Sequence, residues 1–266
     1  MISHLIPDSV FHIYIMSGTM SERKLRHGAW LSLQKCYHSI WCYGEQFSNE
    51  GDEMVEVKRI KCGTGNCYIL AEGRNAVLVD TSRKEYLEKV RLECSDYNLK
   101  LIFITHPHID HAENAATLSK QFECPVAMSG KDIEVLYNFN AQPLKADTLQ
   151  GKVLYRASVK TLMGSKVPDF DNKVFVEEGD SLEKYGINAK VLAFPGHTYG
   201  SLGLDVEEHD LIVGDALMNF VTPSVSLIWH DKEEMLKSVD RIKRIGYRTI
   251  WFGHGNPVDS SKIQGL

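Results

Sequence analysis

The sequence predicts a mixed α/β protein of the α+β kind, in which two β-sheets pack face to face and helices cover their outer faces in four layers. Three observations predict this architecture. Strand patterns dominate the early and the late parts of the regular region, helical patterns lie between them, and the apolar content of 43% is ordinary for a protein that buries a core. The length of 266 residues allows one large domain or two small ones.

The early part of the regular region contains two strands around a Gly-Thr-Gly turn, followed by an alternation of helices and strands. In order, we expect strands over residues 55–62, 66–73 and 75–80, a helix over 84–97, a strand over 100–106, a helix over 111–122 and a strand over 125–130.

The middle of the chain, from about residue 131 to 167, has weaker patterns. Residues 132–139 predict a helix, and the segment after Gln142 is expected to be rich in loops. Beyond it, apolar runs that end in turn signals return, and one segment has the apolar face of an amphipathic helix. We expect strands over residues 173–180, 189–197 and 210–215, a helix over 233–245 and a last strand over 248–255.

Residues 1–53 show no sustained helical or alternating pattern, unlike the domain expected over residues 54–266. They are interpreted as an N-terminal arm. A second interpretation stays open, because Glu50-Gly51-Asp52 back-translates to purine-rich bases just before the codon of Met54. That sequence resembles a bacterial ribosome-binding site, and the native chain would then begin at Met54. The intact mass of the protein made from its native gene distinguishes the two.

Composition excludes several classes of partner. The net charge is −5 and no long basic run occurs, which argues against nucleic acid. No apolar stretch approaches the roughly 20 residues of a membrane span, and the first residues lack the basic start of a secretory signal. The six cysteines form no CxxC pair and are expected to stay reduced. We therefore expect a cytoplasmic protein that acts on a small molecule, in an oligomeric state that the sequence leaves open.

Residues 105–111 read THPHIDH and directly follow an apolar run. Three imidazoles and a carboxylate placed so close together would each need a buried partner or water. Divalent transition metals bind both types of side chain. In an extended segment His106 and His108 point to the same side, whereas Asp110 and His111 follow where the chain turns into a helix. The four side chains therefore divide into two pairs that can face two ions.

Three further candidate ligands also follow apolar strands, and each comes directly after a glycine: His197, Asp215 and His254. Glycine allows a sharp turn at a strand end, where functional groups of layered α/β proteins gather. Seven ligands are too many for one tetrahedral ion and suit two, with open positions that are typical of a catalytic site. The first ion is assigned to His106, His108 and His197, the second to Asp110, His111 and His254, and Asp215 bridges both.

The segment from His106 to His111 resembles the HxHxDH signature of the metallo-β-lactamase fold. PGHTYGS at residues 195–201, GD at 214–215 and FGHG at 252–255 resemble the later motifs of that family, in the same order. The resemblance covers about residues 54–257, and as a set these motifs are highly specific. It implies an αββα sandwich with a dinuclear site at one edge of the sheets. Two divalent ions are expected as cofactors, zinc first, with iron or manganese as alternatives.

Departures within the resemblance narrow the function. Asp215 stands where zinc β-lactamases commonly carry cysteine, as in the glyoxalase II-like and lactonase-like hydrolases. Only 12 residues follow His254, so the chain resembles the short form without a C-terminal helical domain. The implied activity is that of a hydrolase in which two ions share a water, lower its pKa towards about 7, and direct it at an ester, thioester or lactone carbonyl.

Further residues around the ions are expected to have roles in the reaction. Asp110 is expected to act in catalysis as well as in metal binding. Asp80 resembles an aspartate that hydrogen-bonds a ligand histidine, and a turn or helix cap is the alternative reading. His230 is a candidate proton donor to the leaving group. The candidate walls of the substrate pocket are Tyr199, Phe220, Trp229 and His230, with ordinary packing as the alternative.

Two functions from other classes stay open. A mononuclear iron dioxygenase that acts on persulfides would share this fold, hold one ion through His106, His108 and a later residue, and consume oxygen. One iron per chain would favour it. The second alternative is a non-enzymatic metal-bearing module for binding or regulation, which a failure to hydrolyse a broad panel of substrates would favour.

Overall fold

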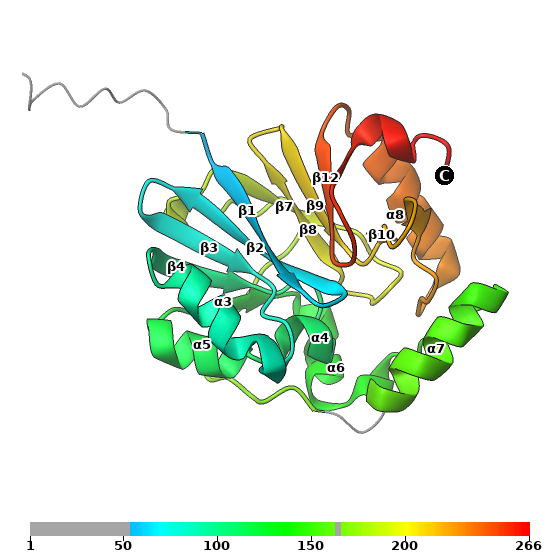
Figure 1. The fold of residues 1–266 in the computed structure, drawn as a ribbon, viewed down its shortest axis with the longest axis horizontal. Coiled ribbons are helices and arrows are strands. Elements are labelled where there is room, and N and C mark those ends of the chain that lie inside the picture. Colours follow the sequence, from blue (N-terminus) through cyan, green and yellow to red (C-terminus); the bar gives the residue numbers. More distant parts are fainter. Residues whose placement is uncertain (1–53, 163–165) are drawn as a thin grey trace, which may run out of the picture. The chain divides into compact units, whose positions relative to one another are not determined.

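The first β-sheet has six strands and is drawn in blue to green in Figure 1. The structure is a computed structural model that describes residues 54–162 and 166–266, so the predictions made for residues 1–53 lie outside the described residues. In spatial order the strands are β1 (Glu56–Cys62), β2 (Gly65–Glu72), β3 (Asn75–Val79), β4 (Asn98–Phe103), β5 (Val126–Met128) and β6 (Lys173–Phe175). The first three pair antiparallel, and β3 to β6 pair parallel.

The second sheet has five strands, in the order β13 (Val258–Asp259), β12 (Thr249–Phe252), β9 (Asp210–Gly214), β8 (Leu202–Val206) and β7 (Ala189–Ala193). Strands β9 and β12 pair parallel, and the other neighbours pair antiparallel. Two short strands, β10 (Leu217–Met218) and β11 (Ser224–Val225), form a separate hairpin. The sequence analysis did not predict β8, whose alternating Leu202, Leu204 and Val206 directly follow the loop of His197.

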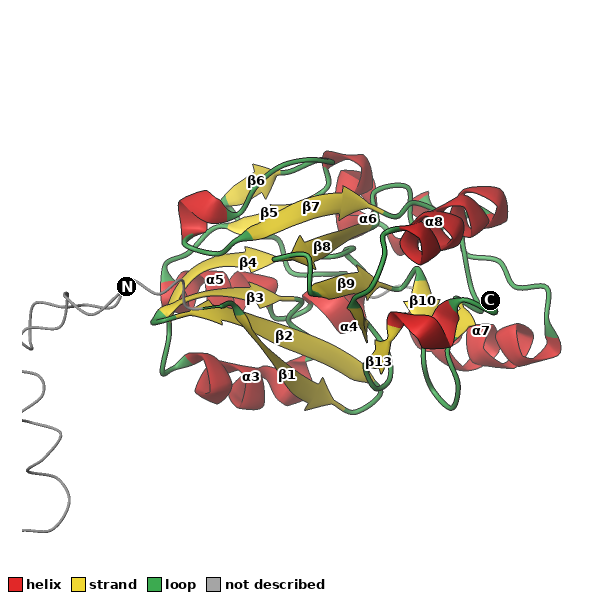
Figure 2. Cartoon of the chain, turned by 90° about the horizontal axis from the view of Figure 1, so that it is seen from above, coloured by secondary structure: helices red, strands yellow, loops and turns green. Residues whose placement is uncertain are grey.

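Six α-helices are described: α3 (Leu87–Cys94), α4 (Ile109–Ala112), α5 (Ala115–Phe122), α6 (Ile133–Tyr137), α7 (Leu149–Leu162) and α8 (Lys232–Arg244). Helices α3 and α5 cover the outer face of the first sheet, and α8 covers the second sheet (Figure 2). Asp231 caps α8, since its carboxylate accepts hydrogen bonds from the backbone N–H groups of Glu233 at 3.0 Å and Glu234 at 3.1 Å. Among the described helices none is long and apolar enough to cross a membrane.

Three buried clusters separate the four layers. Ile69 of β2 points outward and packs with Val90 of α3 and Leu118 of α5. The next residue, Leu70, points inward and packs with the second sheet, as alternation along a strand requires. A third cluster joins the second sheet to α8 through residues such as Ile242. This order of helix, sheet, sheet and helix confirms the predicted αββα sandwich.

Two predictions for the helical segments were wrong in detail. The single helix expected over residues 111–122 breaks into α4 and α5, and Asn114 lies at the break. The segment expected to be rich in loops contains the 14-residue helix α7. The helix was not predicted because Gly151 and Val153 lower the helix propensity of this segment. The helix is stabilised instead by tertiary contacts of Leu154 and Tyr155 with a small apolar cluster around Phe139.

The carboxyl ends of strands from both sheets meet at one edge of the sandwich. In the first sheet these are the ends of β3 and β4, and in the second sheet those of β7, β9 and β12. The loops that leave these ends carry every candidate metal ligand of the sequence. The two sheets therefore supply one site together.

Candidate metal centre

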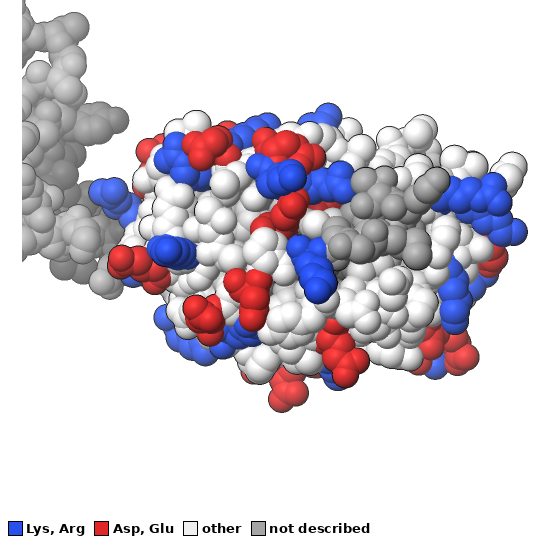
Figure 3. Space-filling model, turned by 90° about the horizontal axis from the view of Figure 1, so that it is seen from below, with Lys and Arg blue, Asp and Glu red and all other residues white. Residues whose placement is uncertain are grey.

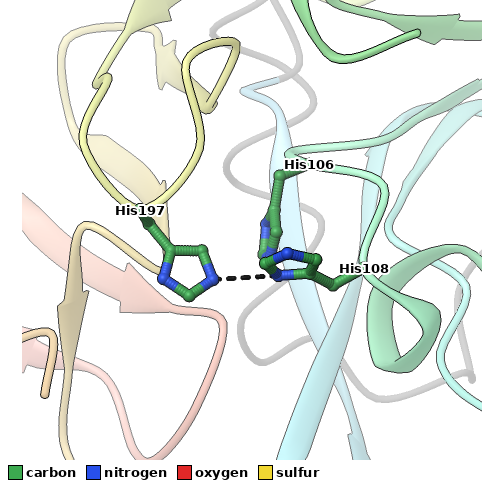
Figure 4. A group of neighbouring side chains, drawn as sticks. All are labelled: His106, His108 and His197. Carbon is green, nitrogen blue, oxygen red and sulfur yellow. Dashed lines mark hydrogen bonds between the residues drawn. The ribbon is translucent and has the colours of Figure 1, made fainter. Parts of the chain in front are cut away.

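The seven side chains singled out as metal ligands converge at this edge. The donor atoms form three overlapping groups, and within each group all of them lie within 4.8 Å of one another. The groups are His106, His108 and His197; His106, His111 and Asp215; and Asp110, His111 and His254. The first and third groups are the two sets that the sequence assigned to two separate ions. Figure 4 shows the first group, in which His197 points across the site towards His106 and His108.

Asp215 lies between the two sets. Its Oδ1 is 3.6 Å from Nε2 of His111, and its Oδ2 is 3.4 Å from Nε2 of His254 and 3.7 Å from Nε2 of His197. The carboxylate thus faces ligands of both sets at once, as a bridging ligand must. Asp110 belongs to the second set, with its Oδ2 3.6 Å from Nε2 of His254.

Fixed acceptors outside the site set the tautomers of two histidines. Nδ1 of His197 donates to the carbonyl of Ile228 at 3.0 Å, and Nδ1 of His254 donates to the carbonyl of Thr64 at 3.1 Å. A carbonyl oxygen only accepts, so the proton of each neutral ring resides on Nδ1. Each Nε2 then keeps a lone pair, directed into the site, that can bind a cation.

Asp80 fixes two more histidines through one carboxylate. Its Oδ2 accepts from Nδ1 of His111 at 2.8 Å, and the hydroxyl of Thr105 donates to the same oxygen at 2.9 Å. Because that hydroxyl has a single hydrogen, it accepts from Nδ1 of His106, which lies 3.1 Å away. Asp80 therefore holds His111 directly and His106 through Thr105. These contacts agree with the reading that gave Asp80 a hydrogen bond to a ligand histidine, and no helix begins at Asp80 for it to cap.

Glycines place the ligands for two different reasons. Gly196 has φ +130°, and a Cβ there would lie 2.3 Å from the backbone of Met235 in α8. Gly253 has no such φ, but a Cβ there would lie 2.1 Å from Oδ1 of Asp215 and 2.9 Å from His111. The sequence explained both glycines by a sharp turn. At Gly253 the reason is the close approach of β12 to the ligands.

Burial and mutual proximity shift the pKa values of the site. Burial, followed by the neighbouring histidines, lowers the pKa of His106 well below its usual value, and burial with His197 beside it lowers the pKa of His108 to about 3. Burial alone would also lower the pKa of His111. The carboxylates of Asp215, Asp80 and Asp110 together outweigh it and raise that pKa to about 10. The site thus contains neutral imidazoles, and its carboxylates favour a positive charge beside them.

Four buried polar atoms in the site have no hydrogen-bond partner among the described residues. They are Nε2 of His106, His108 and His111, and Oδ1 of Asp215. Nδ1 of His108 also faces Nε2 of His197 at 3.0 Å (Figure 4). A buried polar group without a partner is costly. Nε2 of His111 faces Asp215, as Nδ1 of His108 faces His197. Nitrogen lone pairs and a carboxylate placed in this way fit divalent cations, so the residues present fit the expected metal centre.

A buried network supports the loop of His197, and its central residue, Asp132, was not predicted from the sequence. The carboxylate of Asp132 accepts from the hydroxyl of Thr198 at 2.6 Å and from the backbone N–H of Gly200 at 2.8 Å. The side-chain amide of Gln142 donates to it at 2.9 Å. Asp132 is fully buried, and burial raises its pKa despite these donors. In the sequence it looks like the first residue of a helix, and its partners lie 66 and 68 residues away.

A cavity of about 470 Å³ opens over the ligands. One wall is polar and comes from the β1–β2 turn and the loop after β3; it includes Thr64, Ser82 and Arg83. Another part of the lining is apolar and includes Leu154 of α7 and Ile228. The cavity can therefore hold a small molecule with one polar and one apolar part above the candidate ions.

The structure corrects most of the predicted pocket wall. Phe220 lines the cavity, but Tyr199, Trp229 and His230 do not. The ring of His230 packs edge to face on Tyr199, and its Nδ1 donates to the carbonyl of Pro143 at 3.1 Å. Trp229 is buried. His230 is not among the residues that line the cavity, which does not support the predicted role of proton donor to a leaving group.

Comparison with protein families gives one matching model, described as the metallo-beta-lactamase superfamily, over residues 60–254. A probable metallo-hydrolase of Methanocaldococcus jannaschii is 24% identical over 200 residues, which cover 72% of this chain and 88% of the relative. The hydroxyacylglutathione hydrolase GloC of Haemophilus influenzae is 26% identical over 187 residues, which cover 70% of this chain and 82% of that relative.

Among solved structures, the B3 metallo-β-lactamase BLEG-1 superposes with a TM-score of 0.59 at 21% identity. The match covers 79% of this chain and 97% of that one. At this identity the likeness concerns the fold, and it agrees with the four layers described above.

Proposed function

The chain belongs to the metallo-β-lactamase superfamily, and from this premise we propose that it is a metal-dependent hydrolase with two divalent ions that cleaves an ester, thioester or lactone bond of a small molecule. The observation that carries the proposal is the convergence of two complete ligand sets on one shared carboxylate. The name of the Haemophilus influenzae relative, a hydroxyacylglutathione hydrolase, supports placing acyl thioesters first among these substrates.

The donor geometry supports the assignment of the ions to two sets. His106, His108 and His197 would hold the first ion, and Asp110, His111 and His254 the second. Asp215, which faces both sets, would contact both ions. Such ions supply a nucleophilic hydroxide at neutral pH and a Lewis acid for the carbonyl oxygen of the substrate.

The chain itself orients the ligands and binds the substrate. Asp80 keeps the proton of His111 on Nδ1, and Thr105 does the same for His106, so both rings turn Nε2 to the site. Asp110 is partly exposed to the cavity, whereas the histidine ligands are buried. Substrate therefore reaches the centre from the side of Asp110, between the polar and the apolar wall.

The test combines metal analysis with a panel of ester, thioester, lactone and phosphoester substrates. We expect two ions per chain and hydrolysis of at least one carbonyl substrate. Asp215→Ala is expected to lower metal content and to reduce kcat/KM by about 10³-fold or more, because both ions lose a ligand. Asp240→Ala, which changes an exposed aspartate of α8, is the matched control and is expected to behave as wild type.

Other outcomes select other functions. Full activity of Asp215→Ala with normal metal content would contradict the bridging role. One iron per chain together with oxygen consumption would favour the persulfide dioxygenase. Two retained ions without turnover of any substrate in the panel would favour a binding module.

A further inference from the structure

Arg83 is the only lysine or arginine among the described residues that line the cavity. On the face drawn in Figure 3, basic and acidic side chains are interspersed, so that face has no extended field of one sign. Arg83 therefore carries the only lysine or arginine charge within the described lining of the cavity, and exposed charges further than about 8 Å away are screened at physiological salt.

The guanidinium of Arg83 has no partner among the described residues. No hydrogen bond or ion pair of its side chain occurs there, unlike those of Arg241, which pairs with Glu178 at 2.6 Å, and Arg248, which pairs with Asp205 at 2.9 Å. Glu85 lines the same wall but lies beyond ion-pair distance of Arg83. An arginine offers five N–H donors, and all those of Arg83 are available to a ligand.

The backbone beneath Arg83 is fixed to the metal centre. The side-chain amide nitrogen of Asn114 lies within hydrogen-bond distance of three consecutive carbonyl oxygens, which share its two hydrogens: those of Thr81 at 2.9 Å, Ser82 at 3.2 Å and Arg83 at 2.7 Å. The backbone N–H of Thr81 donates to the carbonyl of His111 at 2.6 Å. The turn that carries Arg83 is thus tied to the turn that carries Asp110 and His111. The backbone that carries the guanidinium therefore needs little reordering when a ligand binds, and only the side chain of Arg83 has to be ordered.

The apolar part of the lining favours the other part of the ligand. It includes Leu144, Leu154, Met218, Phe220 and Ile228, so it favours an apolar group. A planar guanidinium binds a carboxylate through two parallel hydrogen bonds. The carboxylate of Glu85 on the same wall disfavours a ligand group of charge −2, such as a phosphate monoester, more than a singly charged carboxylate.

We propose that Arg83 binds a carboxylate of the substrate, so that the enzyme prefers acyl compounds with a carboxylate on one side of the scissile bond and an apolar group on the other. This inference rests on the proposed hydrolase function. It adds to that function a specificity residue and a charge class of substrate.

The test uses thioesters that share one apolar acyl group, hexanoyl, and differ only in the thiol. The thiols are 3-mercaptopropionate, its neutral isostere 3-mercaptopropionamide, and 2-mercaptoethyl phosphate. The measured quantity is the ratio of kcat/KM for the carboxylate to that for the amide. We expect a ratio of about ten or more in the wild type, which corresponds to about 1.4 kcal/mol of charge-assisted hydrogen bonding.

In Arg83→Gln the ratio is expected to fall to about one, through KM rather than kcat, because the lost contact is the same in the ground state and the transition state. Arg83→Lys should retain part of it. Glu85→Gln, which removes the acidic side chain of the same wall, should raise the ratio. A ratio near one in the wild type, or a phosphate preferred over the carboxylate, would overturn the inference. So would equal losses for carboxylate and amide in Arg83→Gln.

A second readout separates this inference from the proposed function. If no thioester is hydrolysed, the hydrolase proposal fails, and binding of hexanoate and hexanamide to the metal-loaded protein is measured by calorimetry. Selective binding of hexanoate that weakens about tenfold in Arg83→Gln would still support the carboxylate site. Equal affinity of hexanoate for the wild type and for Arg83→Gln would refute the carboxylate site.

Discussion

Each ligand histidine except His108 has one ring nitrogen fixed by a hydrogen-bond acceptor, and this decides which nitrogen faces the site. Two of the acceptors are backbone carbonyls, those of Ile228 and Thr64. The other two rings depend on Asp80, directly or through Thr105. Because one carboxylate supports His111 of the second set and, through Thr105, His106 of the first set, a change at Asp80 reaches both sets.

Asp80→Asn is expected to weaken metal binding by about 10- to 100-fold while part of the activity remains. The carboxylate accepts from the N–H and hydroxyl of Thr105 and from Nδ1 of His111. The NH₂ group of asparagine would meet one of these donors, and a ring would turn. Metal affinity measured by competition with a chelator checks the prediction.

Two further variants calibrate that result. Thr105→Val removes the link to His106 alone and should cause a smaller loss than Asp80→Asn. Asp96→Asn changes an exposed aspartate and should bind metal as the wild type does. Wild-type affinity in Asp80→Asn would remove Asp80 from the support of the ligands.

At the scale of elements, the ends of strands from two sheets must approach closely enough for their loops to share one site. Strand β12 ends beside β9, and Gly253 lies against Asp215 from the end of β9. On the other side, the N-terminus of α8 packs under Gly196, whose carbonyl accepts from the N–H groups of His230 and Asp231 at 2.9 Å each. These close contacts are possible only because Gly196 and Gly253 have no side chain, and they bring the ligands at the strand ends together.

Gly253→Ala is expected to lower metal content and activity while the fold is retained. A methyl group 2.1 Å from Oδ1 of Asp215 has to displace that carboxylate, because the backbone of β12 is held in the sheet. Gly265→Ala is the matched control, since a Cβ at that position meets no atom within 4 Å. Metal analysis and circular dichroism of both variants give the result, and a fully loaded Gly253→Ala protein would contradict the close approach.

At the scale of the whole molecule, the folded sandwich buries a group of ionisable side chains that favour different protonation states when no cation is bound. Buried imidazoles are kept neutral on one side, and a histidine surrounded by three carboxylates is kept protonated on the other. Bound ions would satisfy both sides at once. We therefore expect chelation to lower the melting temperature of the protein and added metal to restore it.

The stability of the metal-free protein is expected to fall on either side of about pH 6.5. The folded chain keeps His108 neutral down to a pKa of about 3, so between pH 6.5 and 3 the unfolded chain binds a proton that the folded chain does not. His111 behaves in the opposite way. Its folded pKa of about 10 lies above the unfolded value, so its contribution is lost as the pH rises from 6.5 to 10.

Denaturant unfolding of the metal-free protein at pH 6.5 and pH 5 measures the acid side. His108→Asn removes one titrating ring. Between pH 6.5 and pH 5 its free energy of unfolding should therefore decrease less than that of the wild type, by up to about 1.4 kcal/mol per pH unit. The same pH dependence in both proteins would show that His108 is not held neutral in the folded state.

The sequence by itself determined the ligand set and most of the strand framework. HxHxDH and the later motifs are local patterns, and each follows an apolar strand whose period can be read directly. The four-layer fold followed from the order of strands and helices. Asp80 could be singled out because it ends a strand in the same way as the ligands do.

Only the tertiary structure decided which side chains support and surround the centre. Two of the partners of Asp132, Thr198 and Gly200, lie more than 60 residues away in the chain. Helix α7 depends on contacts with a distant apolar cluster, and Arg83 is a candidate because of where its turn is anchored. His230 does not line the cavity although it follows the loop of Asp215. Such positions result from packing and hydrogen bonds between distant segments, which leave no period or motif in the local sequence.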